Sequence, residues 1–432
     1  MERVKVIGGG LAGCEAAWHL AQSGIKVDLY EMRPIKSTPA HHTDRLAELV
    51  CSNSLRSDEI TNAAGLLKQE MRMLDSIVMK VAESTRVPAG AALAVDRTKF
   101  SSNITEIIKN HPNIKLHIEE MCEIPEPPAI IATGPLTSEA MSKAIAELLG
   151  NEHLYFYDAA APIVTAESIN WDKAFWGSRY NKGDADYVNL PLTRDEYDVF
   201  YNELVTAKTH PLKDFEKPMF FEGCMPVEVM AKRGYETLLF GPLKPVGIID
   251  PKTGKQPFAV VQLRKENNEG TLLNIVGFQT SLKWTEQKRV FGLIPGMEEA
   301  EFVRYGFIHR NTFISSPIHL KPTLELKAIN GIFFAGQITG VEGYIESAAS
   351  GIVAGLNMKR LLNGQEPMVM PTESIIGALL NYITSADPVN FQPMKANFGI
   401  LPQLPNKVKD KTLRKKMLSE RALESIRKIV EL

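Results

Sequence analysis

Residues 4–31 read VKVIGGGLAGCEAAWHLAQSGIKVDLYE. Both ends of this segment have the apolar pattern of buried strands, and the part between them has the apolar spacing of a helix. Gly8, Gly10 and Gly13 occupy the turn between the first strand and the helix, and Glu31 ends the second strand. Glycines let a pyrophosphate approach the backbone at the helix start, and a carboxylate at this place accepts from a ribose hydroxyl. The segment therefore predicts a βαβ unit that binds a dinucleotide.

Two later segments also end a buried strand with glycine. They read AIIATG at 129–134 and GIFFAG at 331–336, and a helix rich in small residues follows the second at about 347–362. Together with the first strand they predict one sheet in an α/β, Rossmann-like fold. The second segment resembles the second FAD fingerprint of glutathione-reductase-like flavoproteins, which favours FAD over NAD. Gln337 stands where those proteins often have aspartate.

The predicted cofactor site gathers the ends of these strands and the start of the helix that follows the last one. Glycine and short side chains there leave room for a nucleotide, and helix starts favour its phosphates. The residues assigned to this site are Gly8, Gly9, Gly10, Leu11, Ala12, Gly13, Glu31, Met32, Arg33, Thr133, Gly134, Gly336, Gln337, Glu342, Gly343 and Tyr344.

Length and composition indicate a globular protein of more than one domain. The chain has 432 residues, of which 44% are hydrophobic and 23% are charged. Because residues 190–317 are richer in aromatic and strand-forming runs, we expect them to form an inserted α+β domain, with 1–189 and 318–432 forming the FAD-binding domain. The sequence contains no long apolar segment or leader, so we expect a cytoplasmic protein.

The four cysteines and the histidines give no metal pattern. The cysteines lack any C-x-x-C spacing, and the pair His41-His42 has no cysteine or glutamate at ligand spacing. We therefore expect neither a metal site nor a disulfide framework.

Any nucleic-acid partner needs a local basic patch, because 49 basic and 51 acidic residues leave a net charge of −2. Residues 407–428 contain nine basic residues against three acidic ones on an expected helix. A solvated amphipathic helix explains this stretch equally well. Its densest group is the candidate RNA-binding patch, formed by Lys411, Arg414, Lys415 and Lys416.

Six runs identify a closer resemblance. They are VIGGGLAGCE at 6–15, YEMRP at 30–34, LVCSNSLR at 49–56, FEGCMP at 221–226, GVEGYIES at 340–347 and ANFGILP at 396–402. Together they closely resemble the TrmFO family of folate- and FAD-dependent tRNA (uracil-5)-methyltransferases over essentially the whole chain. The related GidA family shares the first two runs, but its chains are considerably longer.

This resemblance implies a reaction in which 5,10-methylenetetrahydrofolate passes its one-carbon unit by way of reduced FAD to C5 of the T-loop uridine of tRNA. NAD(P)H supplies the reducing power, and the product is 5-methyluridine. The partners implied are tRNA, bound through its T arm, folate and a nicotinamide nucleotide, without a membrane or an obligatory protein partner. The uridine must leave its stacked position to reach the flavin.

The same resemblance assigns catalysis to Cys51 and Cys224. Uracil C5 becomes nucleophilic only after a group adds at C6, and a thiolate both adds and leaves readily. Cys224 is a candidate for the C6 nucleophile, and Cys51 for a position beside the flavin, but the reverse assignment stays open. Arg56 follows Cys51 closely, and either favours its thiolate or lies on the surface. Cys14 and Cys122 are expected to be structural.

Three side chains are candidates to stack against a pterin ring: Trp284, His309 and Tyr344. Tyr344 lies at the expected start of the helix beside the flavin. The other two fit an ordinary core or surface role at least as well.

Other functions are compatible with the same residues. One is a GidA-like modification of the wobble uridine, which needs a partner GTPase, and another is the same methylation on ribosomal RNA. A third is a non-catalytic flavin-bearing RNA-binding module in which Cys51 and Cys224 are merely packed.

Overall fold

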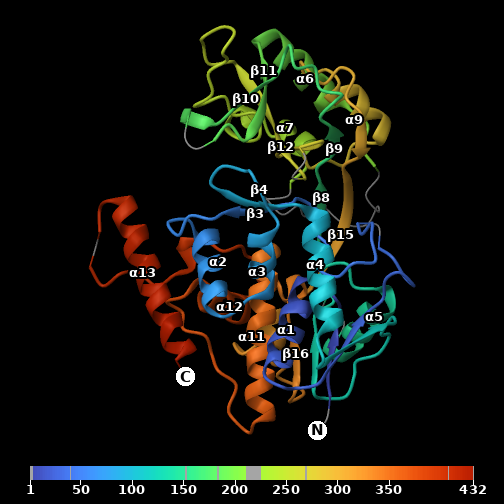
Figure 1. The fold of residues 1–432 in the computed structure, drawn as a ribbon, viewed down its shortest axis with the longest axis vertical. Coiled ribbons are helices and arrows are strands. Elements are labelled where there is room, and N and C mark those ends of the chain that lie inside the picture. The colour runs from blue at the N-terminus through green and yellow to red at the C-terminus, as the bar shows by residue number, and fades with distance from the viewer. Residues whose placement is uncertain are drawn as a thin grey trace.

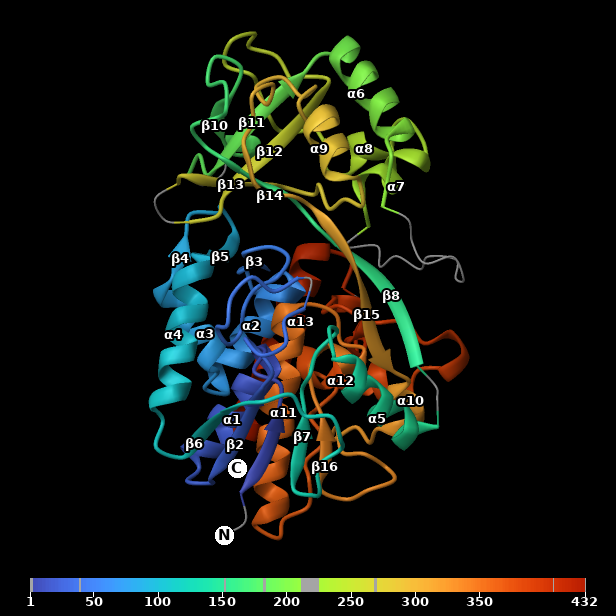
Figure 2. The same ribbon diagram turned by 90° about the vertical axis from the view of Figure 1, so that its right-hand side faces the viewer.

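The computed structural model divides into a lower and an upper lobe, joined by two long strands (Figures 1 and 2). Side chains at 153–160, 307–311 and 390 lie outside the description. The structure describes residues 3–38, 40–150, 153–181, 184–210, 225–267, 270–406 and 408–431.

The lower lobe is built on a five-stranded parallel sheet. Its strand order is β16-β7-β1-β2-β6. The strands β1, β7 and β16 contain almost only buried apolar residues, as expected for a parallel sheet covered on both faces. The predicted Rossmann-like α/β fold, with one sheet assembled from distant segments, is thus confirmed. The strands are Ile332–Phe334 (β16), Ala129–Ile131 (β7), Val4–Ile7 (β1), Val27–Glu31 (β2) and Ile114–Ile118 (β6).

Two helices cross closely against this sheet, α1 (Leu11–Gln22) and α11 (Tyr344–Leu362). A Cβ on Gly351 would lie 2.2 Å from the carbonyl oxygen of Ala12. Only glycine allows this approach, which brings the starts of both helices to the same edge of the sheet. The other helices of the lobe are Ala63–Met73 (α2), Ile77–Ser84 (α3), Arg97–Asn110 (α4), Glu139–Leu149 (α5), Ser316–His319 (α10), Ile375–Ser385 (α12) and Lys411–Val430 (α13).

A small antiparallel sheet lies at the upper end of this lobe, below the second lobe (Figure 1). Its order is β3-β5-β4, with β3 at Ser54–Ser57, β5 at Ala92–Val95 and β4 at Arg86–Val87. The strand β3 begins within the cysteine-containing run at 49–56, three residues after Cys51.

The upper lobe contains a six-stranded sheet in the order β10-β11-β12-β13-β9-β14. Two of its strands precede residue 190 and β14 ends at Arg304, so we propose that the inserted domain runs from about 163 to 304 rather than over 190–317. The strands are Ile163–Thr165 (β9), Phe175–Gly177 (β10), Tyr187–Leu192 (β11), Ala259–Lys265 (β12), Leu272–Ile275 (β13) and Phe302–Arg304 (β14).

Helices cover one side of that sheet, and a two-stranded ribbon links the lobes (Figure 2). The ribbon pairs β8 (His153–Ala160) with β15 (Phe307–Ile314) in antiparallel register. Across the described ranges no helix is both long and apolar enough to cross a membrane. The upper helices are Arg194–Thr206 (α6), Val227–Lys232 (α7), Thr237–Phe240 (α8) and Trp284–Phe291 (α9), and 3-10 turns occur at Arg179–Asn181, Gln337–Thr339, Pro388–Asn390 and Phe398–Ile400.

Candidate active site

The turn after β1 requires glycine for steric reasons. Gly8 has a φ of +104°, and a Cβ there would lie 2.5 Å from the carbonyl oxygen of Ala132. A Cβ on Gly13 would lie 1.8 Å from the carbonyl oxygen of Gly8. Any larger residue would push the turn away from the neighbouring backbone. The predicted glycine pattern therefore forms a tight cradle at the carboxyl end of the sheet, where α/β folds bind nucleotides.

The start of α1 is suited to an anion. Its N-cap residue Gly10 provides no side-chain hydrogen bond, and a Cβ added there would meet no atom within 4 Å. The first N–H groups of a helix lack partners within the helix and carry a partial positive charge. A pyrophosphate group fits beside Gly10, as a cofactor such as FAD requires.

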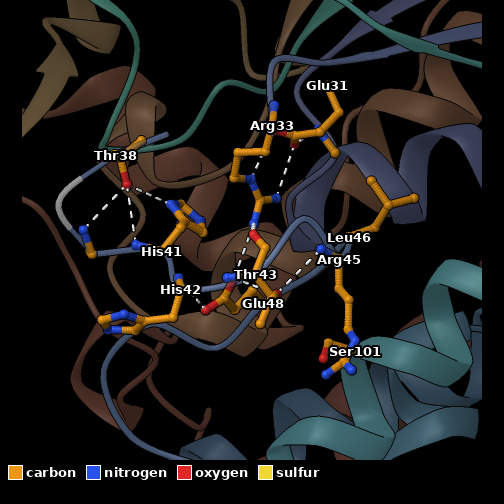
Figure 3. A network of polar contacts seen from close by, with 12 residues as sticks. Glu31, Arg33, Thr38, His41, His42, Thr43, Arg45, Leu46, Glu48 and Ser101 are labelled. Atoms are coloured by element: carbon orange, nitrogen blue, oxygen red, sulfur yellow. Dashed lines mark hydrogen bonds and ion pairs between the residues drawn. The ribbon is translucent and has the colours of Figure 1, made fainter. Parts of the chain in front are cut away.

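Glu31 joins this cradle to a buried ion-pair network, which Figure 3 shows in close view. Its Oε2 accepts from Gly9 N–H at 3.0 Å, and its Oε1 accepts from Nε of Arg33 at 2.9 Å. Arg33 also contacts Glu48, with Nη1 and Oε2 3.2 Å apart. Burial alone would raise the pKa of Glu31, but the hydrogen bonds and charge of Arg33 outweigh it and lower that pKa. Glu31 thus remains a carboxylate that can also accept from a ribose.

Glu48 is a site residue that the motifs did not reveal. It accepts from Thr43 Oγ1 at 2.8 Å and from His42 N–H at 2.9 Å, so it holds the loop after β2 over the cradle. No glycine pattern or strand end marks its position in the sequence.

These residues surround a pocket with about 990 Å³ of empty space, part of which is open to solvent. Three predicted cofactor residues do not line this first pocket. Gly13 packs against the backbone of Gly8 in the turn, and Glu342 and Gly343 line the adjoining second pocket. The predicted cofactor residues that line the first pocket are Gly8, Gly9, Gly10, Leu11, Ala12, Glu31, Met32, Arg33, Thr133, Gly134, Gly336, Gln337 and Tyr344.

The second pocket, with about 1140 Å³ of empty space, contains Cys51. It shares Val50, Pro135, Gln337 and Tyr344 with the first pocket, so the two are contiguous. The backbone N–H of Cys51 donates to the Tyr344 hydroxyl at 2.6 Å. Burial, followed by the nearby charge of Cys51, raises the pKa of Tyr344, so its hydroxyl keeps its proton. A thiol therefore lies beside the predicted cofactor pocket.

Three arginines hold the segment around Cys51. The carbonyl oxygen of Cys51 accepts from Arg304 Nη2 at 2.7 Å and from Arg97 Nη2 at 3.1 Å. Arg264 Nη2 donates to Ser52 Oγ at 2.8 Å and to Asn53 Oδ1 at 2.7 Å. None of these arginines adjoins Cys51 in the sequence, so local patterns could not reveal them.

Arg56 lines the same pocket, but its guanidinium pairs with the buried carboxylate of Glu346 on α11. Glu346 also accepts from Ala396 N–H at 2.9 Å. Arg56 thus joins the strand β3 to α11, a role that sequence proximity to Cys51 did not suggest.

Comparisons with known proteins agree with this architecture. A family described as "Glucose inhibited division protein A" matches residues 3–366. A Listeria innocua protein named "Methylenetetrahydrofolate--tRNA-(uracil-5-)-methyltransferase TrmFO" is 62% identical over 428 residues, or 99% of each chain. The chain belongs to the TrmFO family, within the GidA group.

Two further comparisons extend this result. The TrmFO protein of Halalkalibacterium halodurans is 60% identical over 99% of this chain and 98% of its own. The solved structure of Aquifex aeolicus GidA superposes with a TM-score of 0.72 at 18% identity. It covers all of this chain but only 74% of that one, and at this identity it demonstrates a shared fold alone.

The remaining cysteines of this TrmFO-family chain differ in their surroundings. Cys14 is fully buried in α1, where burial raises its pKa, and its thiol donates to the carbonyl oxygen of Gly9. Cys122 is exposed. Cys224 lies outside the described residues, so its predicted catalytic role stays a prediction.

The three predicted folate contacts do not lie together in this TrmFO-family structure. Tyr344 lies between the two pockets, whereas Trp284 is 60% exposed at the start of α9 and stacks on Tyr305 with ring centroids 5.5 Å apart. Trp284 lines neither pocket. His309 lies on β15, and its side chain is outside the description.

Among described residues no group of three or more metal-ligating side chains occurs, and His41 Nδ1 instead lies 2.6 Å from Thr38 Oγ1.

Lys68 of α2 supports the segment after Cys51 and leads to a stability prediction. Its buried Nζ donates to the carbonyl oxygens of Leu55 at 2.9 Å and Ser57 at 2.5 Å. Burial is the main cause that lowers its pKa to about 7. Because unfolded lysine releases its proton only near pH 10, the unfolded chain binds more protons between about pH 7 and pH 10.

We therefore expect the wild-type protein to gain stability relative to Lys68→Met as pH rises from about 7 to 10. The slope should approach about 1.4 kcal/mol per pH unit in urea unfolding. Lys80→Met, on the exposed side of α3, should show no such trend. A difference between wild type and Lys68→Met that stays constant with pH would contradict the assignment.

Proposed function

We propose that this chain catalyses C5-methylation of the T-loop uridine of tRNA, with 5,10-methylenetetrahydrofolate as one-carbon donor and FAD as cofactor. Uridine, methylenetetrahydrofolate, NAD(P)H and a proton would yield 5-methyluridine, tetrahydrofolate and NAD(P)⁺. The full-length similarity to methyltransferases of this name supports the reaction class. The T-loop position and the nicotinamide reductant follow from the resemblance to the TrmFO family, and the flavin from that resemblance together with the glycine motifs.

The contiguity of the two pockets across Tyr344 is the observation that carries this proposal. The first pocket has a glycine cradle and a helix start suited to a dinucleotide, and the second presents Cys51 to the same space. Methylation through a cofactor requires the one-carbon unit, the reductant and a thiol to meet at one place. The hydrogen bond between Cys51 N–H and the Tyr344 hydroxyl, which lies between the two pockets, supports a meeting point there.

The protein's part in the reaction is to activate and position uracil. A cysteine thiolate adds to C6 and its electron pair forms the S–C6 bond, which makes C5 nucleophilic. After C5 receives the one-carbon unit, the C5 proton is lost and the thiolate leaves. When bound, FAD supplies the redox chemistry and carries the one-carbon unit. We assign the C6 addition to Cys224 and the position beside the cofactor to Cys51. Cys51 lines the second pocket, and its N–H donates to the hydroxyl of Tyr344, which lines both pockets.

The experiment that tests this function incubates the purified protein with FAD, NADPH, labelled methylenetetrahydrofolate and an unmodified tRNA transcript. Label in 5-methyluridine at the T loop, absent without folate, is the expected result. Label at the wobble position would support a GidA-like function. Label found only with a ribosomal RNA transcript would keep the chemistry but replace the substrate.

The helix α13 is the proposed tRNA contact. Its four candidate residues at 411, 414, 415 and 416 are all exposed, which suits phosphate binding. Replacing all four by glutamine should weaken tRNA binding about tenfold or more and lower the salt slope by up to about three. Filter binding over a salt series would measure both, and unchanged binding would exclude the patch. The matched control neutralises four exposed lysines elsewhere, Lys26, Lys80, Lys109 and Lys143.

A further inference from the structure

The three arginines around Cys51 form a largely buried cluster with more positive than negative charge. Arg97 pairs with Glu266 at 2.5 Å. Among the described residues, Arg304 donates hydrogen bonds to the neutral carbonyl oxygens of residues 50, 51 and 161, and the charge of Glu266 also acts on it. Arg264 contacts the neutral side chains of Ser52 and Asn53. Across the described contacts, one carboxylate thus faces three guanidinium groups.

Buried charges of this kind require a counter-charge. Arg264 is 6% exposed and Glu266 is 4% exposed, and the Nε atoms of all three arginines have no hydrogen-bond partner among the described residues. Burial, followed by the charge of Arg97, lowers the pKa of Arg304 to about 10. Unbalanced charges in a low-dielectric environment are costly, and an anion close to the cluster would stabilise it.

We propose that the thiolate of Cys51 is this anion, so that Arg97 and Arg304 are positioning residues that keep Cys51 ionised at neutral pH. Both guanidinium groups bind the carbonyl oxygen of Cys51 itself. The charge of Cys51 in turn raises the pKa of Arg304, as expected for groups close in space. Neighbouring cations favour a thiolate over a thiol. The role of this thiolate in methylation rests on the proposed function, but its ionisation can be measured without it.

Other polar groups face the same segment, and one of them opposes ionisation. Glu266, directly after β12, is negative, whereas the Tyr344 hydroxyl on α11 is neutral. Arg264 on β12 adds a third positive charge. His42, in the loop that Glu48 holds, is near enough for the charges of Arg304 and Arg97 to lower its pKa, with burial the larger cause. His42 therefore loses its proton below its usual titration range, so at pH 7 it adds no charge to the cluster.

The test is the pH profile of Cys51 alkylation by iodoacetamide in the full-length protein, after reduction, followed by peptide mass spectrometry. Exposed Cys122 in the same molecule is the internal reference. In wild type we expect Cys51 to react with a midpoint well below that of Cys122. Arg304→Gln and Arg97→Gln should each raise the Cys51 midpoint by about one pH unit, which lowers the alkylation rate about tenfold at pH values below the wild-type midpoint.

Two variants separate charge from structure. Arg304→Lys keeps the positive charge but loses the planar guanidinium group. The midpoint of Cys51 alkylation in this variant should therefore stay near that of wild type. Glu266→Gln removes the single carboxylate of the cluster. The midpoint of Cys51 alkylation should therefore fall, in contrast to its rise in Arg304→Gln and Arg97→Gln. Arg289→Gln, an exposed arginine of α9 paired with Glu203, is the matched control and should change nothing. Circular dichroism would verify that each variant is folded.

Equal midpoints for Cys51 and Cys122 in wild type would overturn the proposal. So would shifts of the same sign in Glu266→Gln and Arg304→Gln, because only a loss of structure would produce both. A wild-type protein with an early Cys51 midpoint but no methylation of any tRNA would instead leave the thiolate in place and refute the proposed function.

Discussion

Gly13→Ala will lower the free energy of unfolding by about 3 kcal/mol and remove bound FAD. The added Cβ would lie 1.8 Å from the carbonyl oxygen of Gly8, and both groups belong to the backbone of one tight turn. Neither can move without separating α1 from β1, so the cradle opens even in the apoprotein. Urea unfolding of the apoprotein and flavin absorbance after gel filtration would measure the two effects.

Gly10→Ala is the matched comparison, because it changes the same turn without a steric clash. Its Cβ would meet no protein atom within 4 Å and would project into the space assigned to the cofactor. We expect unchanged stability of the apoprotein but at least tenfold weaker FAD binding. If Gly10→Ala bound FAD as tightly as wild type, the pyrophosphate could not lie beside the start of α1.

Cys51→Ala will reduce formation of 5-methyluridine by at least about a hundredfold. Cys51 is the described thiol that lines the second pocket, and its N–H binds the Tyr344 hydroxyl between the two pockets. The substitution removes only Sγ, so the N–H bond and the arginine contacts to the carbonyl oxygen persist. FAD content and stability should therefore remain close to wild type, and the loss should appear in single-turnover methylation.

Cys122→Ala is the control for this experiment, since Cys122 is exposed and lines neither pocket. It should retain full activity. Methylation by Cys51→Ala at the wild-type rate would restrict the role of Cys51 to packing.

Local sterics explain why the cofactor pocket was predictable from sequence. Gly8 and Gly13 are required by contacts within one turn, and Glu31 ends the strand beside it. The predicted residues therefore converge because parallel strands end at one edge of the sheet. The folate candidates were less predictable, because Trp284 belongs to an amphipathic helix whose exposed position depends on how the upper lobe folds.

The surroundings of Cys51 show what lies beyond sequence patterns. Arg97 starts α4, Arg264 lies on β12 and Arg304 ends β14, and each has an unremarkable local sequence. They meet where the lower lobe contacts β12, and Asn53 joins the two there by donating to the carbonyl oxygens of Val95 and Lys265. Arg56, which adjoins Cys51 in the chain, pairs with α11 instead.

The amino-acid sequence alone determined the α/β fold, the glycine cradle and the family, because these depend on periodicity and on steric limits within a few residues. Only the tertiary structure decided which charges surround Cys51, how Glu31 is paired with Arg33, and where the two pockets join. Electrostatic environments are sums over residues distant in the chain, and their sign and strength depend on burial, which exists only after folding.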